Sequence, residues 1–159
     1  YNVQVKRVGR FDVQKANALN IPKKLWSILQ KQQSVEFEGK TYTSDMVLGS
    51  PRKGIKVSYC TDTRPTKELP AFVENSDLFI CEGMYGEKDK IQKAKEYKHM
   101  MFTEAAEIAK KANVNEMWLT HFSPAMPFPE EFLPSAKEIF ENTHIGKDRK
   151  NVTLLFEED

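Results

Sequence analysis

The sequence predicts an α/β fold with helices on at least one face of a sheet. After Gly54, short apolar runs alternate with segments that carry an apolar stripe at 3.6-residue spacing, an alternation typical of α/β proteins. The 159 residues are 40% apolar and 30% charged, which suffices for one globular domain with an ordinary core. The sequence contains no internal repeat and no low-complexity stretch.

The amino-terminal segment predicts a strand followed by helical structure. Residues 1–8 alternate apolar and polar side chains, as a half-buried strand does, and Gly9 ends the pattern. Residues 12–32 are expected to be helical, because Asp12 suits an N-cap and Pro22 suits the start of a second short helix.

A small hairpin is expected next, at residues 35–42, with its turn at Gly39 and a linker at 50–54. Trp26, in the helical part before the hairpin, could stack on a nucleic-acid base or belong to a small core. The core is favoured because apolar residues surround Trp26 at helical spacing, namely Leu25, Ile28 and Leu29.

The rest of the chain alternates predicted strands with predicted helices. The strands are expected at 55–60, 77–82, 116–120 and 151–156. The helices are expected at 66–75, 87–98, 103–113 and 130–141. Thr66 and Thr103 suit N-caps, and Pro70 falls in a first helical turn, where proline is tolerated.

The net charge of +1 hides an asymmetry along the chain. Residues 1–56 hold 11 Lys and Arg against 4 Asp and Glu, whereas residues 57–159 hold 13 against 19, so the two parts carry +7 and −6. A basic segment ahead of an acidic body favours contact with a polyanion such as RNA. A lysine-rich surface that is merely solvated is the alternative.

The sequence shows no apolar run long enough to cross a membrane and no signal peptide, so we expect no membrane association and a cytoplasmic location. Cys60 and Cys81 lie in short apolar runs, as buried free thiols of a reducing compartment do, although a disulfide is the alternative. Their separation fits no zinc-knuckle pattern.

Polar residues stand at the ends of the predicted strands: Asp62, Glu82 and His121, with His99 ahead of a predicted helix. Ligands of α/β proteins bind beyond the carboxyl ends of strands, and two carboxylates with two imidazoles suit a metal-assisted hydrolase. Each residue also has a structural interpretation. Asp62 could be a turn aspartate paired with Arg64, and the other three could be ordinary strand-end or surface side chains.

In this order, these residues resemble four motifs of the ribonuclease Z family of the metallo-β-lactamase superfamily. Residues 55–64 are similar to its strand followed by Gly-Asp-Thr-Arg, and residues 78–85 to the segment that contains His-Glu-Ala-Thr. His99 matches a later histidine ahead of a helix, and Leu119-Thr120-His121-Phe122-Ser123 resembles the segment of its last metal-binding histidine. The resemblance covers essentially the whole chain.

The resemblance implies the carboxy-terminal half of a metallo-β-lactamase αββα sandwich with a protruding basic arm near the amino terminus. Residues 1–8 would be the end of a core strand, 9–54 an exosite-like arm that binds tRNA, and 55–159 the second half of the core. The arm residues expected to bind RNA are Lys15, Lys23, Lys24 and Lys31.

The resemblance also implies the chemistry of the intact enzyme, which removes the 3′ trailer of precursor tRNA. Two zinc ions would be held there, with Asp62 bridging them and His121 as a further ligand. Glu82 would orient His99, which would protonate the leaving oxygen. Arg64 is expected to pair structurally with a carboxylate, and His144 to lie on the surface.

Several positions depart from the family pattern. Thr61 replaces the glycine before the aspartate, Cys81 replaces the histidine of His-Glu-Ala-Thr, and Met100 and Met101 replace Ser-Thr after the later histidine. The Gly-Pro motif of the family's arm is absent, with Ile21-Pro22-Lys23-Lys24-Leu25-Trp26 near its place.

The family's His-x-His-x-Asp-His signature is also absent from these 159 residues. We therefore expect little or no zinc and no nuclease activity from this chain alone, an exposed apolar sheet face, and a longer parent chain, a partner or a homodimer. Two other functions are compatible with the sequence. One is a metallo-β-lactamase-like hydrolase of a small molecule, and the other is a non-catalytic RNA-binding or dimerisation fragment.

Overall fold

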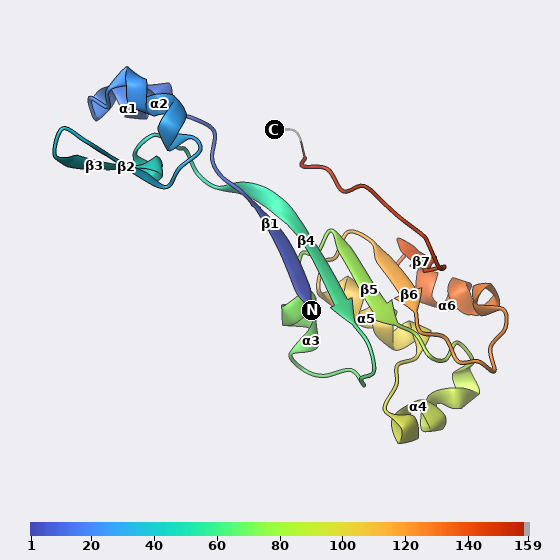
Figure 1. The fold of residues 1–159 in the computed structure, drawn as a ribbon. Helices are drawn as coiled ribbons and strands as arrows, with labels where there is room; N and C mark the ends of the chain where they lie inside the picture. The colour runs from blue at the N-terminus through green and yellow to red at the C-terminus, as the bar shows by residue number, and fades with distance from the viewer. Residues whose placement is uncertain (158–159) are drawn as a thin grey trace. The chain divides into compact units, whose positions relative to one another are not determined.

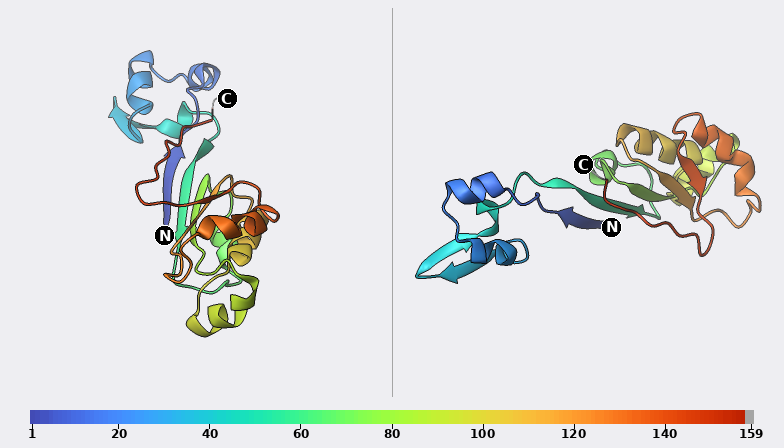
Figure 2. Two further views of the ribbon diagram at one scale, coloured as in Figure 1. Left: turned by 90° about the vertical axis from the view of Figure 1, so that its right-hand side faces the viewer. Right: turned by 90° about the horizontal axis from the view of Figure 1, so that it is seen from above.

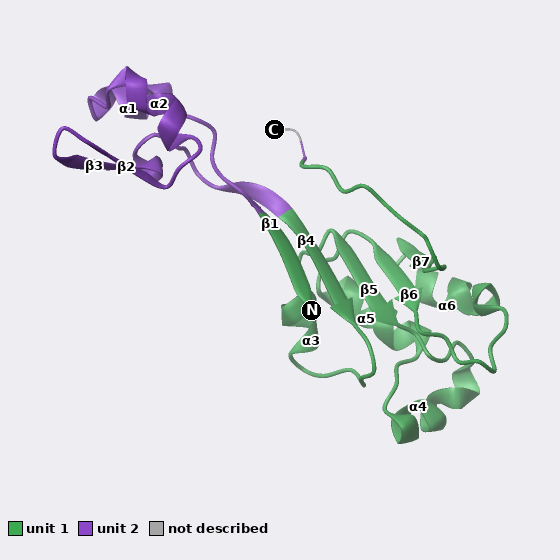
Figure 3. Cartoon of the chain, viewed as in Figure 1, with its two compact units in different colours: residues 1–5, 55–156 green, residues 6–54, 157–159 purple. Residues whose placement is uncertain are grey.

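The computed structural model describes residues 1–157, which form two compact units (Figure 3). One unit comprises residues 1–5 and 55–156, and the other comprises residues 6–54 together with Glu157. Each unit folds around its own set of buried apolar side chains.

The sheet of the first unit follows the strand order β1-β4-β5-β6-β7 (Figure 1). The strands are β1 (Asn2–Arg7), β4 (Arg52–Cys60), β5 (Leu78–Glu82), β6 (Met117–Thr120) and β7 (Thr143–Ile145). From β4 to β7 each strand runs parallel to its neighbour. At the opposite edge, Tyr1 and Tyr59 exchange backbone hydrogen bonds of 2.7 and 2.8 Å, which hold β1 beside β4.

Helices α3, α5 and α6 pack on one face of this sheet (Figure 2). The helical segments of the unit are α3 (Leu69–Val73), η2 (Lys88–Lys90), α4 (Ile91–Tyr97), α5 (Phe102–Lys111), η3 (Pro129–Phe132) and α6 (Leu133–Lys137). α5 buries Phe102, Ala105, Ala106, Ile108 and Ala109. The three alanines among them let the helix lie close against Phe79 of β5 and Leu119 of β6 in the shared core.

Apolar side chains at the β1 edge are exposed. Tyr1, Val3 and Val5 are 86%, 64% and 51% exposed, and the ring of Tyr1 stacks on that of Tyr59 at 6.5 Å. Exposed neighbouring apolar groups of this kind are typical of a surface that another polypeptide covers.

The second unit contains short helices and a hairpin. Its elements are α1 (Val13–Ala18), α2 (Lys23–Leu29), β2 (Ser34–Phe37), β3 (Lys40–Thr43) and η1 (Ser44–Met46). Asp12 caps α1 by accepting the Lys15 N–H at 2.9 Å, and Gly39 takes a φ of +75° at the hairpin turn. Trp26 belongs to the core, as favoured above: its indole N–H donates to the Ile21 carbonyl at 3.0 Å.

Several predicted elements were wrong. The strand expected at 151–156 is absent from the described residues, and the short β7 occupies the sheet edge instead. Val152, Leu155 and Phe156 are exposed, so the apolar pattern of that stretch is not buried against the sheet. β4 already begins within the expected linker 50–54, at Arg52.

The expected helices also differ in their limits. α3 spans only part of 66–75 and is preceded by Glu68 rather than capped by Thr66. α5 begins at Phe102, so Thr103 lies inside the helix and not at its N-cap. The helix expected at 130–141 is replaced by η3 and α6, and that at 87–98 by η2 and α4.

Within residues 1–157, no helix combines the length and apolar character needed to cross a membrane. Cys60 and Cys81 are free thiols, as expected, and Cys81 is fully buried.

Candidate metal centre

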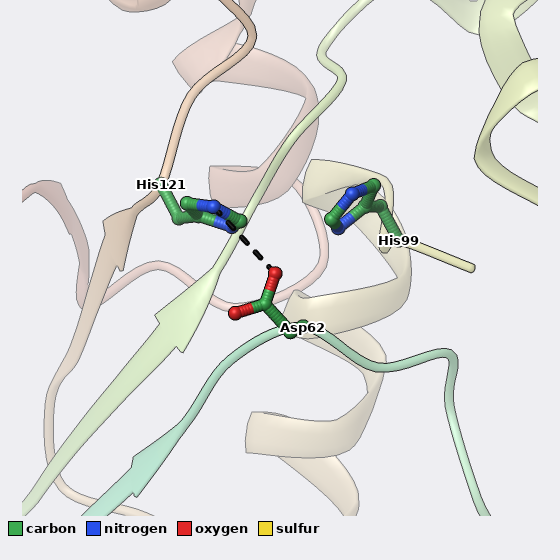
Figure 4. A group of neighbouring side chains, drawn as sticks. All are labelled: Asp62, His99 and His121. Carbon is green, nitrogen blue, oxygen red and sulfur yellow. Dashed lines mark ion pairs between the residues drawn. The ribbon is translucent and has the colours of Figure 1, made fainter. Parts of the chain in front are cut away.

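The candidate site lies at the carboxyl ends of three parallel strands. Asp62 follows β4 and His121 directly follows β6 (Figure 4). Glu82 ends β5. Asp62 and His121 have φ values of +52° and +57°, so the chain turns sharply as it leaves each strand. Because the strands are parallel and adjacent, these turns bring side chains from separate parts of the sequence to one sheet edge.

One carboxylate and two imidazoles converge here. Asp62, His99 and His121 each offer one ligand atom, and the three atoms lie within 4.8 Å of one another. Asp62 Oδ1 is 3.7 Å from His121 Nε2, and the two imidazole rings meet edge to face at 5.4 Å between centroids (Figure 4). His99, predicted only as a proton-transfer residue, therefore also stands in position to bind a metal. The sequence signals for His99 were its place shortly before a predicted helix and its match to the family's later histidine.

The carboxylate of Glu82 contacts both histidines of this cluster. Its side chain is fully buried, and its Oε2 lies 2.9 Å from His99 Nδ1 and 3.9 Å from His121 Nδ1. The carboxylate also accepts the backbone N–H of Thr63 and, at 3.4 Å, that of Met100. If His99 donates through Nδ1, its Nε2 is left as the atom that can bind a metal or carry a proton to substrate.

Arg64 joins the loop after β4 to the start of α5. Its guanidinium donates to both oxygens of Glu104 and to the His99 carbonyl, and Glu104 accepts the Met101 N–H at 2.9 Å. This confirms Arg64 as the structural partner of a carboxylate. That carboxylate is Glu104, so the alternative in which Asp62 pairs with Arg64 is wrong.

The cysteine that departs from the family pattern points away from the site. Cys81 belongs to the core, while its neighbour Glu82 points to the opposite side of β5 and reaches the histidines. Burial and then a hydrogen bond to Cys60 raise the pKa of the Cys81 thiol well above its usual value. The same hydrogen bond lowers the pKa of Cys60 despite the opposing effect of burial.

His144 and the predicted RNA-binding lysines lie outside the cluster. The His144 ring is 2.9 Å from the Asn142 side-chain oxygen and 3.7 Å from Glu116, at a partly exposed position. In the second unit, Lys15 donates to two backbone carbonyls and Lys24 lies over the Phe37 ring at 3.7 Å. Lys23 and Lys31 are also exposed on the second unit.

A family model described as "Beta-lactamase superfamily domain" matches residues 11–122, which include parts of both units and all four site residues, Asp62, Glu82, His99 and His121. The chain belongs to the beta-lactamase superfamily.

Superfamily members similar to this chain are named Ribonuclease Z. The one from Agathobacter rectalis is 58% identical over 159 residues, all of this chain and 52% of its own length. The one from Clostridium acetobutylicum is 58% identical over 157 residues, 99% of this chain and 51% of its own length. The chain thus spans about half the length of the curated relatives it matches.

Among solved structures, human tRNase Z, short form, aligns with 73% of this chain and 37% of its own, with a TM-score of 0.51 and 18% identity. At that identity, the likeness supports the superfamily fold alone. It agrees with the α/β architecture and the metallo-β-lactamase fold expected from the sequence.

The donor set of this superfamily member fits a metal ion. Carboxylate oxygen and imidazole nitrogen are ligands that zinc accepts, and Glu82 supplies the outer hydrogen bond that commonly orients a metal-binding histidine. The cluster could therefore contribute ligands to a metal centre at this sheet edge.

Proposed function

We propose that this chain is part of a metal-dependent endoribonuclease that removes the 3′ trailer of precursor tRNA. The observation that carries the proposal is the convergence of Asp62, His99 and His121 over the buried Glu82. That convergence occurs in a chain that is 58% identical to relatives named Ribonuclease Z.

In this proposal Asp62 and His121 would hold zinc. When bound, zinc lowers the pKa of a coordinated water and neutralises charge on the phosphate that is attacked. His99, held at Nδ1 by Glu82, gives a proton from Nε2 to the leaving oxygen. Glu82 is the positioning residue in this step, because its hydrogen bonds fix the ring and stabilise the imidazolium.

The second unit is proposed to bind the tRNA body through the phosphates, with Lys15, Lys23, Lys24 and Lys31 as the basic residues. All four are exposed, but Lys15 donates to backbone carbonyls and Lys24 lies over the Phe37 ring. Lys23 and Lys31 are therefore the members best suited to direct contact. Binding of this kind weakens steeply as salt increases.

We further propose that the enzyme is cytoplasmic and acts as a homodimer. The exposed Tyr1, Val3 and Val5 support an apolar contact with another polypeptide. Sedimentation of the purified chain would test dimerisation, and a monomer at micromolar concentration would contradict it.

A chimera tests the nuclease proposal. Residues 1–159 would replace the matching segment, 52% of the Agathobacter rectalis relative, and the product would be assayed on a precursor tRNA transcript. We expect the chimera to release the 3′ trailer of the transcript. A chelator should stop this cleavage, and added zinc should restore it. Asp62→Ala and His121→Ala should each lower kcat/KM by about 100-fold or more, and His99→Ala should lower kcat by about 100-fold. His144→Ala is the control and should cleave at the unsubstituted rate.

Other outcomes would separate the competing functions. Undiminished cleavage by Asp62→Ala or His121→Ala would refute the assigned ligands. Hydrolysis of bis(p-nitrophenyl) phosphate without cleavage of precursor tRNA would favour a small-molecule hydrolase. Salt-sensitive tRNA binding without cleavage by the chimera would favour a non-catalytic RNA-binding chain.

The 159-residue chain by itself is proposed to hold little zinc. Zinc sites in proteins use three or four well-fixed ligands, whereas the Asp62 side chain is 68% exposed. We expect well under one zinc ion per chain after dialysis, measured by atomic emission, and no cleavage of precursor tRNA. Stoichiometric zinc together with cleavage would contradict this expectation.

A further inference from the structure

A group of closely spaced lysines lies in the segment between Glu82 and His99, the two residues that pair at the metal centre. Residues 57–159 hold 13 Lys and Arg against 19 Asp and Glu, yet five of these basic residues fall within residues 88–98. They are Lys88, Lys90, Lys93, Lys95 and Lys98. Together with Tyr97 they are called the α4 lysine surface below.

The segment that carries this surface begins and ends beside the metal centre. It leaves the sheet after Glu82 and returns at His99, and these two residues are in contact at 2.9 Å. The return is fixed by hydrogen bonds from Phe102 N–H to the Tyr85 carbonyl and from His99 N–H to the Ala94 carbonyl, both 2.9 Å. In Figure 1, α4 lies beyond the carboxyl ends of β5 and β6, the sheet edge that bears the site.

A small apolar cluster determines which side of the segment faces solvent. Ala94 is fully buried and packs with Met84, Tyr85 and Met101, and Ile91 packs against them. The lysines occupy the other helical positions, where Lys88, Lys93, Lys95 and Lys98 are exposed. The buried side of α4 thus orients the charged side outward.

Residues 88–98 hold the five lysines against two acidic residues, Asp89 and Glu96, so the segment carries a net charge of +3. Lys90 pairs with Asp89 at 3.3 Å, but among the described residues no carboxylate forms an ion pair with Lys88, Lys95 or Lys98. The Lys93 ammonium lies 5.8 Å from the Tyr85 ring and 5.9 Å from the Tyr97 ring, and Tyr97 is 57% exposed. Unpaired cations beside an exposed aromatic ring are the combination with which proteins track an RNA strand.

We propose that the α4 lysine surface binds the phosphates of the RNA near the scissile bond. This inference rests on the proposed function, because it assigns the surface to the same RNA that the metal centre would cleave. It places a phosphate-binding surface in the compact unit that contains the site, in addition to the lysines proposed for the second unit. Tyr97 would offer its exposed ring to a base.

Matched charge reversals in the 159-residue chain test the proposal. One triple variant carries Lys88→Glu, Lys93→Glu and Lys95→Glu. The control carries the same number of reversals at exposed lysines of α5 and α6, Lys110→Glu, Lys111→Glu and Lys137→Glu. Circular dichroism would check that both remain folded, and fluorescence anisotropy would follow binding of a labelled precursor tRNA over a range of salt concentrations.

We expect the first variant to bind at least about tenfold more weakly and to lower the slope of log Kd against log salt by about two to three, since each phosphate contact contributes close to one. The control should change Kd by less than about threefold, because its charges lie away from the bound strand and are screened. Lysine acetylation read by mass spectrometry should show RNA protecting Lys88, Lys93 and Lys95 but not the control lysines.

The outcomes separate this inference from the proposed function. Salt-dependent binding by the unsubstituted chain, with equal affinities in the two variants and equal acetylation of both lysine sets, would overturn the α4 lysine surface alone. Absence of salt-dependent tRNA binding by the unsubstituted chain would overturn the α4 lysine surface and the RNA-binding role of the second unit, whereas cleavage by the chimera tests the nuclease function separately.

Discussion

At the scale of single residues, Glu82 is the residue on which the site depends most. Its carboxylate is fully buried, and the neighbours that satisfy it are the His99 ring and the N–H groups of Thr63 and Met100. A buried carboxylate needs such donors, since leaving it unpaired would cost far more than the hydrogen bonds contribute. Glu82 therefore links the positions of the loop after β4 and of His99.

Glu82→Gln is expected to lower the free energy of unfolding by about 1–3 kcal/mol. The amide keeps the size of the side chain but presents an N–H₂ group where the carboxylate accepts from the backbone N–H groups of Thr63 and Met100. Urea unfolding of the chain would measure the loss. Glu107→Gln, at an exposed position of α5, is the control and should change stability by less than about 0.5 kcal/mol. Equal stabilities of the two variants would contradict the role given to Glu82.

The raised pKa of the Cys81 thiol predicts that the folded protein loses stability at alkaline pH. Burial and the hydrogen bond to Cys60 raise its pKa in the folded protein well above the usual value of 9.0. The unfolded thiol ionises as pH rises past about 9 while the folded thiol keeps its proton, so this group's contribution is complete below pH 9 and is lost above it.

Cys81→Ala should remove that alkaline loss. Above pH 9 the free energy of unfolding of the unsubstituted chain should fall relative to that of Cys81→Ala by up to about 1.4 kcal/mol per pH unit. Urea titrations at pH 8, 9, 10 and 10.5 would measure the difference. Parallel stability curves over this range would show that the Cys81 thiol does not titrate differently in the two states.

At the scale of elements, the ion pair of Arg64 and Glu104 fixes a loop to a helix. The side chains are 25% and 19% exposed, so the pair is shielded from solvent more than a surface salt bridge is. Arg64 also donates to the His99 carbonyl, so its guanidinium ties the loop that follows Asp62 both to His99 and to Glu104 in the first turn of α5. The relative positions of Asp62 and His99 depend on this contact.

Arg64→Lys is expected to cost about 1–3 kcal/mol of stability, because an ammonium cannot reproduce the two parallel donors of the guanidinium. Hydrogen exchange should also show faster exchange at the His99 and Met101 amides. Arg149→Lys, at an exposed position in the segment after β7, is the control. Unchanged exchange at both amides in Arg64→Lys would argue against the role of the pair in holding the site.

At the scale of the whole molecule, the two units have separate cores. Leu29 is fully buried among Leu25 and Val47 in the second unit, and Leu119 is fully buried among Phe79 and Phe102 in the first. Separate cores allow one unit to open while the other stays folded.

Leu29→Ala should therefore destabilise the second unit by about 2–5 kcal/mol and increase hydrogen exchange mainly within residues 6–54. Leu119→Ala, an equal truncation, should increase exchange mainly in the strands and helices of residues 55–156. Exchange that rises throughout both units in each variant would show that the chain unfolds as one cooperative body.

Local patterns determined much of the fold. The hairpin with Gly39 at its turn, the Asp12 cap and the strands β4, β5 and β6 follow from turn chemistry and from runs of apolar residues, which depend on neighbours in the sequence. Placing Asp62, Glu82 and His121 at strand ends was likewise possible from sequence, because that placement needs only the limits of each strand.

The tertiary structure decided what depends on contacts between distant residues. β7, with only Thr143, His144 and Ile145, has too short a pattern to be recognised, and it is a strand because β6 offers it an edge. Nothing in the sequence around Arg64 identifies Glu104, 40 positions away, as its partner. The sequence thus determined which side chains stand at the sheet edge, whereas parallel pairing of the strands and burial of Glu82 decided how those side chains meet.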